Sequence, residues 1–153
     1  MEVVPFAPEH LGKLKLQSAQ AYLGELMTGE QAAIIAETGP AFSACIDGEI
    51  IGCCGLIEQW PGRAIGGALL GQCGPRAFAM VHREAKRFLD EQDYRRIETT
   101  VEHDFCNGHR WVRALGFQLE TPDGMRAWSP DGRTLLVVGK DTNGRRGIYR
   151  VDA

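Results

Sequence analysis

The sequence predicts a mixed α+β fold, in which one twisted, mostly antiparallel sheet of six to seven strands carries helices on both faces. Short apolar runs separated by turn signals recur along the chain, as expected for strands. A long amphipathic segment with helical spacing covers 78–92, and a β-rich run follows it directly. A strand, a helix and a strand in this order imply a right-handed crossover and one parallel pair of strands.

The composition fits one globular domain, which we expect over 1–140, with a C-terminal tail or an added hairpin over 141–153. The 153 residues are 44% hydrophobic and 24% charged, enough apolar material for one substantial core. A formal net charge of −3 gives no overall attraction to nucleic acid or to an anionic membrane. The chain has neither a signal-peptide pattern nor a run of membrane-spanning length, so we expect a cytoplasmic protein without nucleic-acid or membrane partners.

The five cysteines form no CxxC pair and leave one cysteine unpaired in any disulfide scheme. Cys53 and Cys54 are neighbours on an expected strand, so their side chains point to opposite faces and do not share a metal ion. The four histidines show no ligand spacing either. We therefore expect reduced cysteines in the core and no metal site.

The first forty residues predict one short strand and two helices. Val3 and Val4 suit a strand that ends at proline. From Leu11 to Thr38 the apolar residues recur near helical spacing, and Gly29 is expected to separate two helices.

Three consecutive antiparallel strands are predicted next. Asp47-Gly48 accepts positive φ in a tight turn between two apolar runs and so predicts a hairpin. A Trp-Pro-Gly turn at 60–62 leads into the strand RAIGGALLGQ at 63–72. The Gly-Gly pair inside this strand indicates a bulge, a close approach by a ligand, or close packing of a neighbouring helix.

The rest of the chain predicts a crossover unit followed by further strands. The helix over 78–92 packs on the sheet through one apolar face, and the strand RRIETTVE follows at 95–102. Gly116 is placed to end a second helix, roughly 105–115. Further strands are expected at 117–120 and 134–140, with turn sequences on either side of 125–128.

This order of elements, with a Leu-Gly-Phe corner at 115–117, resembles the GNAT superfamily of N-acetyltransferases over nearly the whole chain to about Lys140. The resemblance implies that the fourth and fifth strands splay apart and that acyl-CoA lies in the gap. It also implies transfer of an acetyl group from acetyl-CoA to the amine of a small molecule or a protein. The acceptor itself is not specified by any charge cluster in the sequence.

The segment QCGPRA at 72–77 resembles the family's Gln/Arg-x-x-Gly-x-Gly/Ala motif, which holds the CoA pyrophosphate. It carries Pro75 where the central glycine is usual, and proline has no N–H for a phosphate oxygen. The fixed φ of proline instead suits the first position of a helix, so a plain helix N-terminus is the alternative. The cofactor-binding residues that the resemblance implies are Leu70, Gln72, Gly74, Arg76 and Ala77.

The segment FCNGHRWVRALGF at 105–117 resembles the family's Asn-x-x-Ala-x-x-x-Tyr-x-x-x-Gly-Phe signature. Alignment on Gly-Phe puts Phe105 at the Asn, Gly108 at the Ala and Val112 at the Tyr. The tyrosine is the usual proton donor to the departing CoA thiolate. Trp111 does not replace it, because an indole hardly gives up its proton, which leaves His109 and Cys106 as donor candidates.

Acetylation of an amine also needs a base that takes a proton from the attacking ammonium. The candidates are Glu58 before the Trp-Pro-Gly turn, Glu98 within the strand at 95–102, and His103 at the end of that strand. Glu102 lies on the same strand face as Glu98 and is a further candidate. The alternative for each strand carboxylate is a surface group or an ion-pair partner.

The C-terminal part also resembles acetyltransferase-like proteins encoded among the structural genes of short-tailed phages, including an internal virion protein. The likeness covers GHRWVRALGF at 108–117, a short strand, RAWSPDGR at 126–133 and a final apolar strand. It implies an alternative function, a catalytically degenerate GNAT-fold protein that contacts virion proteins in the host cytoplasm or the virion. An acyl-CoA-binding regulator without turnover is a third possibility.

Overall fold

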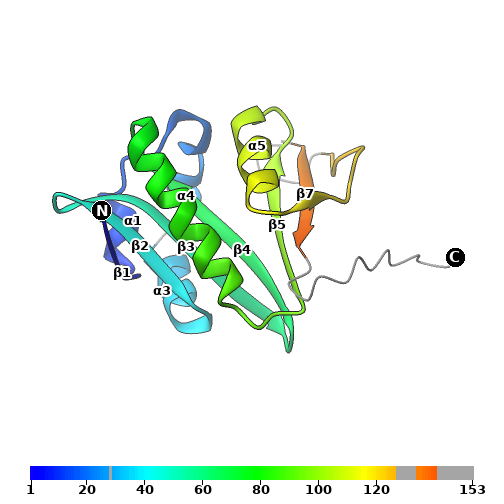
Figure 1. Ribbon diagram of the computed structural model, residues 1–153, viewed down its shortest axis with the longest axis horizontal. Coiled ribbons are helices and arrows are strands. Elements are labelled where there is room, and N and C mark those ends of the chain that lie inside the picture. Colours follow the sequence, from blue (N-terminus) through cyan, green and yellow to red (C-terminus); the bar gives the residue numbers. More distant parts are fainter. Residues whose placement is uncertain (28, 127–133, 141–153) are drawn as a thin grey trace, which may run out of the picture. The chain divides into compact units, whose positions relative to one another are not determined.

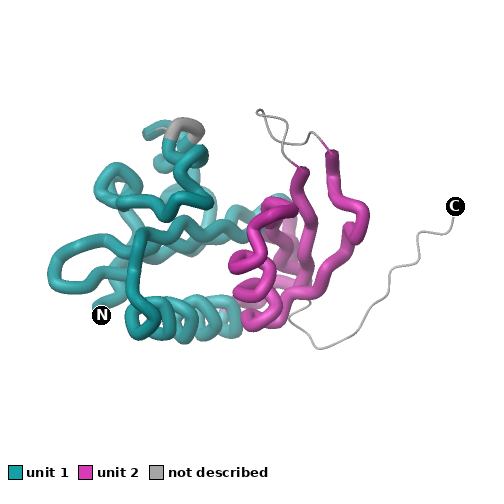
Figure 2. Tube along the Cα trace, turned by 90° about the horizontal axis from the view of Figure 1, so that it is seen from above, with its two compact units in different colours: residues 1–59, 65–91 teal, residues 60–64, 92–153 magenta. Residues whose placement is uncertain are grey.

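The structure is a computed structural model that describes residues 1–27, 29–126 and 134–140. It has a mixed α+β architecture with one seven-stranded, mostly antiparallel sheet that contains one parallel pair, in the order β1-β2-β3-β4-β5-β7-β6 (Figure 1). The predicted fold class is confirmed. The chain divides into two compact units, the first comprising 1–59 and 65–91 and the second 60–64 and 92–153 (Figure 2).

The helices and strands follow one another in nearly the predicted order. They are β1 (Glu2–Pro5), α1 (Glu9–Lys13), the 3₁₀ helix η1 (Ser18–Gln20), α2 (Leu23–Leu26), α3 (Gly29–Thr38), β2 (Ala41–Ile46), β3 (Glu49–Trp60), β4 (Arg63–Leu70), α4 (Pro75–Asp90), β5 (Arg96–Glu102), α5 (Cys106–Ala114), β6 (Gln118–Leu119) and β7 (Leu135–Lys140). No helix of the described residues is long and apolar enough to cross a membrane. The turn expected after 128 and the tail over 141–153 lie outside the described residues.

The segment between β1 and β2 differs from the two helices that its periodicity predicts. Three short helical pieces, α1, η1 and α2, precede α3, which begins at Gly29. Between α1 and η1 the chain is extended, and Leu16 forms an isolated antiparallel bridge with Gly71. A hydrogen-bond partner far along the chain therefore overrides the local helical pattern.

The predicted hairpin at Asp47-Gly48 is confirmed in the first unit. Both turn residues have positive φ, 51° and 82°, and β2 and β3 pair antiparallel on either side of them. β1 pairs antiparallel with β2. The second predicted turn is also present, with Gly62 at φ 87° just before β4.

Helices cover both faces of the strands in the first unit. Gly52 and Gly55 of β3 are three residues apart and so face opposite sides of the sheet. A Cβ at Gly52 would lie 3.9 Å from a methyl of Val81 in α4, and one at Gly55 would lie 3.4 Å from a methyl of Ile35 in α3. In Figure 1, α4 accordingly crosses in front of the strands while α3 lies behind them. In contrast, among the parts of the chain that the structure describes, no atom beyond the chain neighbours lies within 4 Å of a Cβ at Gly67, so packing of a described helix does not explain this glycine of the Gly-Gly pair.

The second unit is built on β5 and β7, which pair antiparallel, with β6 paired to β7. The alternation predicted for β5 is confirmed, because Ile97 and Val101 are buried. α5 is followed by Gly116 at φ 97°, as predicted for a helix-ending glycine. Leu115 and Phe117 on either side of it are buried, so the corner packs into the core of this unit.

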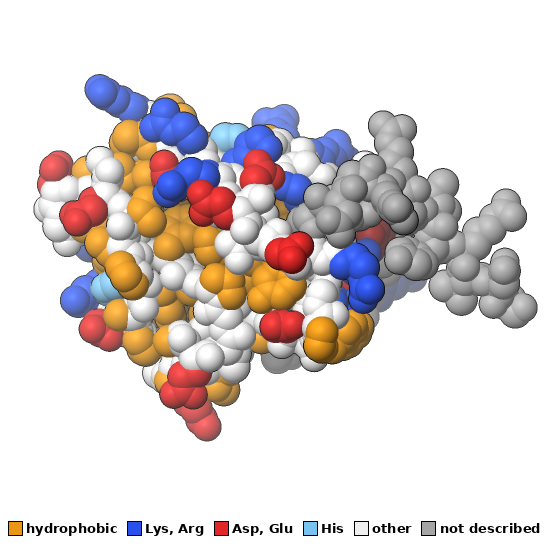
Figure 3. Space-filling model, turned by 60° about the horizontal axis from the view of Figure 1, so that its bottom comes forward, with side chains coloured by type: hydrophobic (Ala, Val, Ile, Leu, Met, Phe, Trp, Pro, Cys, Tyr) orange, Lys and Arg blue, Asp and Glu red, His pale blue; other side chains and the backbone are white. Residues whose placement is uncertain are grey.

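Charged side chains of both signs lie on the face of the molecule that Figure 3 draws. On the face drawn in Figure 3, acidic and basic side chains are interspersed among apolar ones. Along α4, Lys86 pairs with Asp90 at 3.0 Å and Arg87 with Glu84 at 2.7 Å. These basic residues of α4 therefore lie in local ion pairs.

Candidate functional site

The turn between β4 and α4 places an uncapped helix N-terminus at the surface. Gly74 is the N-cap residue and has no side chain to cap the helix, and Pro75 is the first residue of α4. Gln72, Gly74 and Arg76 are exposed, and Ala77 is half-buried. The N–H groups of Arg76 and Ala77, at the positive end of the helix dipole, can therefore receive an anion.

Gly74 is not required by the conformation of this turn. Its φ of −72° and ψ of 166° are extended values that any residue adopts. Apart from its chain neighbours, no described residue would have an atom within 4 Å of a Cβ at this position. The missing side chain therefore leaves the backbone open to close approach by a ligand.

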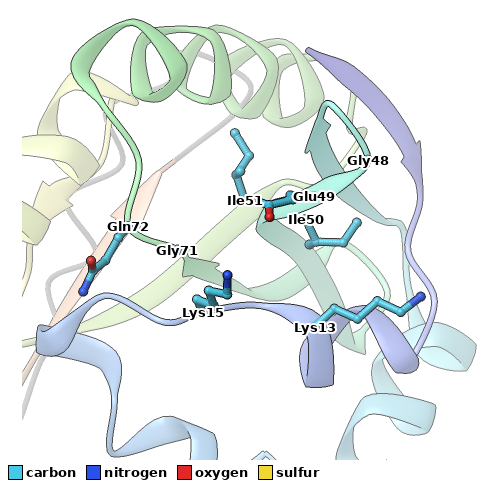
Figure 4. Close-up of a pocket in the computed structure, with 8 residues that line it drawn as sticks. All are labelled: Lys13, Lys15, Gly48, Glu49, Ile50, Ile51, Gly71 and Gln72. Atoms are coloured by element: carbon cyan, nitrogen blue, oxygen red, sulfur yellow. The ribbon is translucent and has the colours of Figure 1, made fainter.

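A hollow of about 220 Å³ lies beside the end of β4 in the first unit. The residues that line it are Lys13, Lys15, Gly48, Glu49, Ile50, Ile51, Gly71 and Gln72 (Figure 4). They come from the end of α1 and the chain after it, from the β2–β3 hairpin and from the chain after β4. Two lysines and one glutamate thus border the Gln72 side of the turn.

Leu70 and Gln72 have backbone partners within the chain. The Leu70 N–H donates to Oε1 of Gln20 at 2.9 Å, and Leu70 itself is buried. The Gln72 N–H donates to the carbonyl of Lys15 at 3.2 Å. Sequence reasoning missed Gln20 because a single glutamine in an amphipathic segment carries no signal of its own.

Glu98 is held by two arginines in the second unit. Its Oε1 pairs with Arg63, and its Oε2 accepts a hydrogen bond from Nε of Arg96 at 2.7 Å. Arg96 also binds both carboxylate oxygens of Glu120, at 2.8 and 2.5 Å. Burial raises the pKa of Glu98, but the hydrogen bonds from Arg96 and Arg63 outweigh burial and lower this pKa overall. Glu98 is therefore a paired anion at neutral pH.

The guanidinium of Arg63 also lies over the ring of Trp60, 4.1 Å from its centroid. Trp60 is 54% exposed, so one face of a large aromatic ring meets solvent while Arg63 covers the other. The ion-pair reading of Glu98 was one of the sequence alternatives, but the identity of its arginine partners was not readable. Arg63 and Glu98 lie too far apart in the sequence for spacing to indicate the pair.

The two other base candidates are exposed and lie in different units. Glu58 is on β3 of the first unit, and the described residues form no ion pair with it. His103, in the second unit, has its Nδ1 2.7 Å from Oδ1 of Asp104. A carboxylate only accepts, so Nδ1–H of His103 donates to Asp104 and orients the ring.

The proton-donor candidates of α5 differ in availability. Nε2 of His109 donates to the backbone carbonyls of Glu102 and His103, at 3.0 and 3.1 Å, and so ties α5 to the end of β5. Val112, at the tyrosine position of the resembled signature, is only 8% exposed. Cys106 is an exposed thiol at the start of α5. Among the described residues, no group of three or more candidate ligands gathers at a metal-binding distance.

The fold is similar to that of solved acetyltransferases, two of which are described as members of the GNAT family. The aminoglycoside 6'-acetyltransferase type Ii superimposes with a TM-score of 0.71 over 95% of this chain and 99% of that chain, at 14% identity. The ribosomal-protein-S18-alanine N-acetyltransferase from Escherichia coli gives 0.69 over 99% of both chains, at 12% identity. A GNAT-family acetyltransferase from Streptococcus pneumoniae gives 0.67 over 92% of this chain and 98% of that chain, at 14% identity.

At these identities the likeness concerns the fold. No protein-family model matches the sequence. No curated protein is detectably similar to it in sequence either. The GNAT-type fold expected from the order of elements is thus present. The similarity of fold does not identify the acceptor.

Proposed function

We propose that this protein binds acetyl-CoA at the β4–α4 turn and transfers the acetyl group to an amine. The observation that carries the proposal is the uncapped N-terminus of α4 directly after β4, with open backbone at Gly74. The N–H groups of Arg76 and Ala77 and the guanidinium of Arg76 suit a pyrophosphate. Pro75 supplies no N–H, so this cradle has one donor fewer than the motif it resembles.

The reaction forms an amide and breaks the C–S bond of the thioester. A backbone N–H of β4 between Gly66 and Leu70 would polarise the carbonyl oxygen, and a base would take one proton from the attacking ammonium. We assign the base to exposed Glu58, which lies in the first unit together with the β4–α4 turn, with His103 as the next candidate because Asp104 orients its ring. Both oxygens of Glu98 are already occupied by arginines, so Glu98 ranks third.

The burial of Val112 does not forbid this chemistry. A thiol has an ordinary pKa near 8.5, so the sulfur leaves as a thiolate and takes a proton from water at neutral pH. A dedicated donor would accelerate the step but is not needed to balance it. Exposed Cys106 is a further source of a proton.

Isothermal calorimetry with acetyl-CoA and a free-thiol release assay over an amine panel test the proposal. We expect binding, and thiol release that depends on the amine. Gly74→Ala should leave thermal stability unchanged, since its Cβ meets open space, and should weaken acetyl-CoA binding roughly tenfold by blocking backbone approach. Gly29→Ala is the matched control, because that glycine is exposed and equally open.

Specific observations favour a second candidate, a GNAT-fold protein without turnover. Val112 is buried where a tyrosine is usual, and Glu98 is neutralised by arginines. Binding without thiol release would identify an acyl-CoA-binding regulator. No binding at millimolar acetyl-CoA would exclude both the acetyltransferase and the acyl-CoA-binding regulator and would leave a structural role. Presence of the protein in purified phage particles would support that role.

A further inference from the structure

Near its end, β4 pairs with β3 along one edge and with a segment that precedes η1 along the other. The Gly71 N–H donates to the carbonyl of Ile51 in β3, at 2.9 Å. Backbone groups of successive strand residues point to opposite sides, so Ala68, Leu70 and Gln72 present theirs to the edge away from β3. These backbone groups would be open to an extended ligand if no other segment of the chain paired with them.

The chain from Lys15 to Gln20, here called the edge segment, pairs with this edge. The Gln17 N–H donates to the Leu70 carbonyl at 3.0 Å, and the Gln72 N–H donates to the Lys15 carbonyl at 3.2 Å. The bridge between Leu16 and Gly71 lies between these bonds. The edge segment thus begins as a short antiparallel strand alongside the end of β4.

The side chain of Gln20 continues the pairing. Its Oε1 accepts from the Leu70 N–H at 2.9 Å, and its Nε2 donates to the Ala68 carbonyl at 2.8 Å. Nε2 of Gln17 donates to the same Oε1 at 3.0 Å. Because a backbone N–H only donates and a carbonyl only accepts, the orientation of the Gln20 carboxamide is fixed. It meets β4 as a peptide group of a neighbouring strand would.

We propose that the edge segment is an autoinhibitory latch that acyl-CoA must displace. This inference rests on the proposed function, since it concerns the same site. The pantetheine arm of acyl-CoA contains amides, each with one N–H and one carbonyl, which pair with a strand edge as a peptide does. The Leu70 N–H and Ala68 carbonyl serve either Gln20 or this arm, but not both. The apparent affinity is therefore the intrinsic affinity multiplied by the fraction of molecules in which the latch is open.

Gln20→Ala tests the latch, with Gln20→Leu as a second variant that keeps the side-chain volume. Ser18→Ala is the control, because Ser18 lies exposed in the same segment and its side chain forms no hydrogen bond with the described residues. Amide exchange in the free protein should be faster at Leu70 in both Gln20 variants. Their affinity for acetyl-CoA should rise roughly tenfold, as expected when a few hydrogen bonds no longer hold the closed state.

In the wild type, adding acetyl-CoA should accelerate exchange at the Gln17 amide, whose partner at Leu70 is lost when the segment leaves. Equal affinity of wild type and Gln20 variants, with Gln17 still protected in the complex, would overturn the latch and leave the proposed function intact. If neither the wild type nor the Gln20 variants bind acetyl-CoA, while Leu70 exchange is accelerated in the variants, the proposed function fails and the latch proposal fails with it.

Discussion

The side chain of Phe105 packs against Gly108 at the start of α5. A Cβ at Gly108 would lie 2.4 Å from a ring carbon of Phe105 and 3.0 Å from a methyl of Val101. The ring of Phe105 therefore takes the space that an alanine side chain would need. The resembled signature has Asn and Ala at these two positions. In this chain the larger Phe105 fills the space that the smaller Gly108 leaves free, so the two differences compensate in volume.

Gly108→Ala should lower the free energy of unfolding by roughly 1–3 kcal/mol, because the overpacking outweighs the better helix propensity of alanine. In a Phe105→Asn background the same substitution should be neutral or stabilising by up to about 1 kcal/mol. Urea unfolding of the four proteins of this double-mutant cycle measures the coupling. Additive effects would show that the Phe105 ring is not what excludes the Cβ.

Glu98 predicts a defined pH dependence of stability. Its pKa in the folded protein lies below the ordinary 4.5, since Arg96 and Arg63 outweigh the opposing effect of burial. The pairing therefore stabilises the fold above pH 4.5 and is lost as pH falls through the lower folded-state pKa. Glu98→Gln should cost about 1–3 kcal/mol at neutral pH, with the difference shrinking below about pH 4.

Urea unfolding across a pH series measures this difference. Glu58→Gln is the control for the loss of one surface carboxylate, because Glu58 is exposed and the described residues form no ion pair with it. A constant cost of Glu98→Gln at all pH values would mean that packing, not charge, holds this side chain.

At the scale of the elements, Pro75 decides how the first turn of α4 meets an anion. Its ring fixes the helical φ but removes one N–H. Pro75→Ala restores this donor, so acetyl-CoA should bind roughly three- to tenfold more tightly, with little change in thermal stability. Calorimetry and thermal unfolding measure the two quantities. An unchanged affinity would show that the missing amide does not limit binding.

Elements defined by local chemistry are also those that the sequence predicts. Asp47-Gly48 specifies its turn through the positive φ that both residues adopt, and α4 follows from an apolar face at helical spacing. The region between β1 and α3 is the exception, because its helical periodicity does not produce the predicted helix. There the pairing of Leu16 with Gly71 competes successfully with weak helical periodicity, because short isolated helices are marginal in water.

At the scale of the whole molecule, the cysteines differ sharply in accessibility. Cys106 is exposed, whereas Cys53 and Cys54 are buried on opposite faces of β3. Burial, with a smaller contribution from neighbouring Cys53, raises the pKa of Cys54 to about 12. Thiolates are the reactive species, so burial protects these thiols both sterically and chemically.

Iodoacetamide should therefore label native Cys106 first, and Cys53 and Cys54 only after unfolding. Peptide mass spectrometry over a time course measures the order, and Cys106→Ser should remove the fast phase. Rapid labelling of Cys54 in native buffer would mean that the strands of the first unit open readily.

The sequence by itself determined the mixed α+β class, the hairpin, the long crossover helix and the corner after α5, because turn chemistry and periodicity act between near neighbours. It also located the β4–α4 turn through the Gly-Pro helix start. Only the tertiary structure decided that Glu98 is paired with Arg63 and Arg96, that Phe105 excludes a side chain at Gly108, and that Gln20 occupies the edge of β4. The ion pair to Arg63 and the bonds of Gln20 join residues distant in the chain. The Phe105–Gly108 exchange depends on how one ring is packed, which spacing alone does not specify.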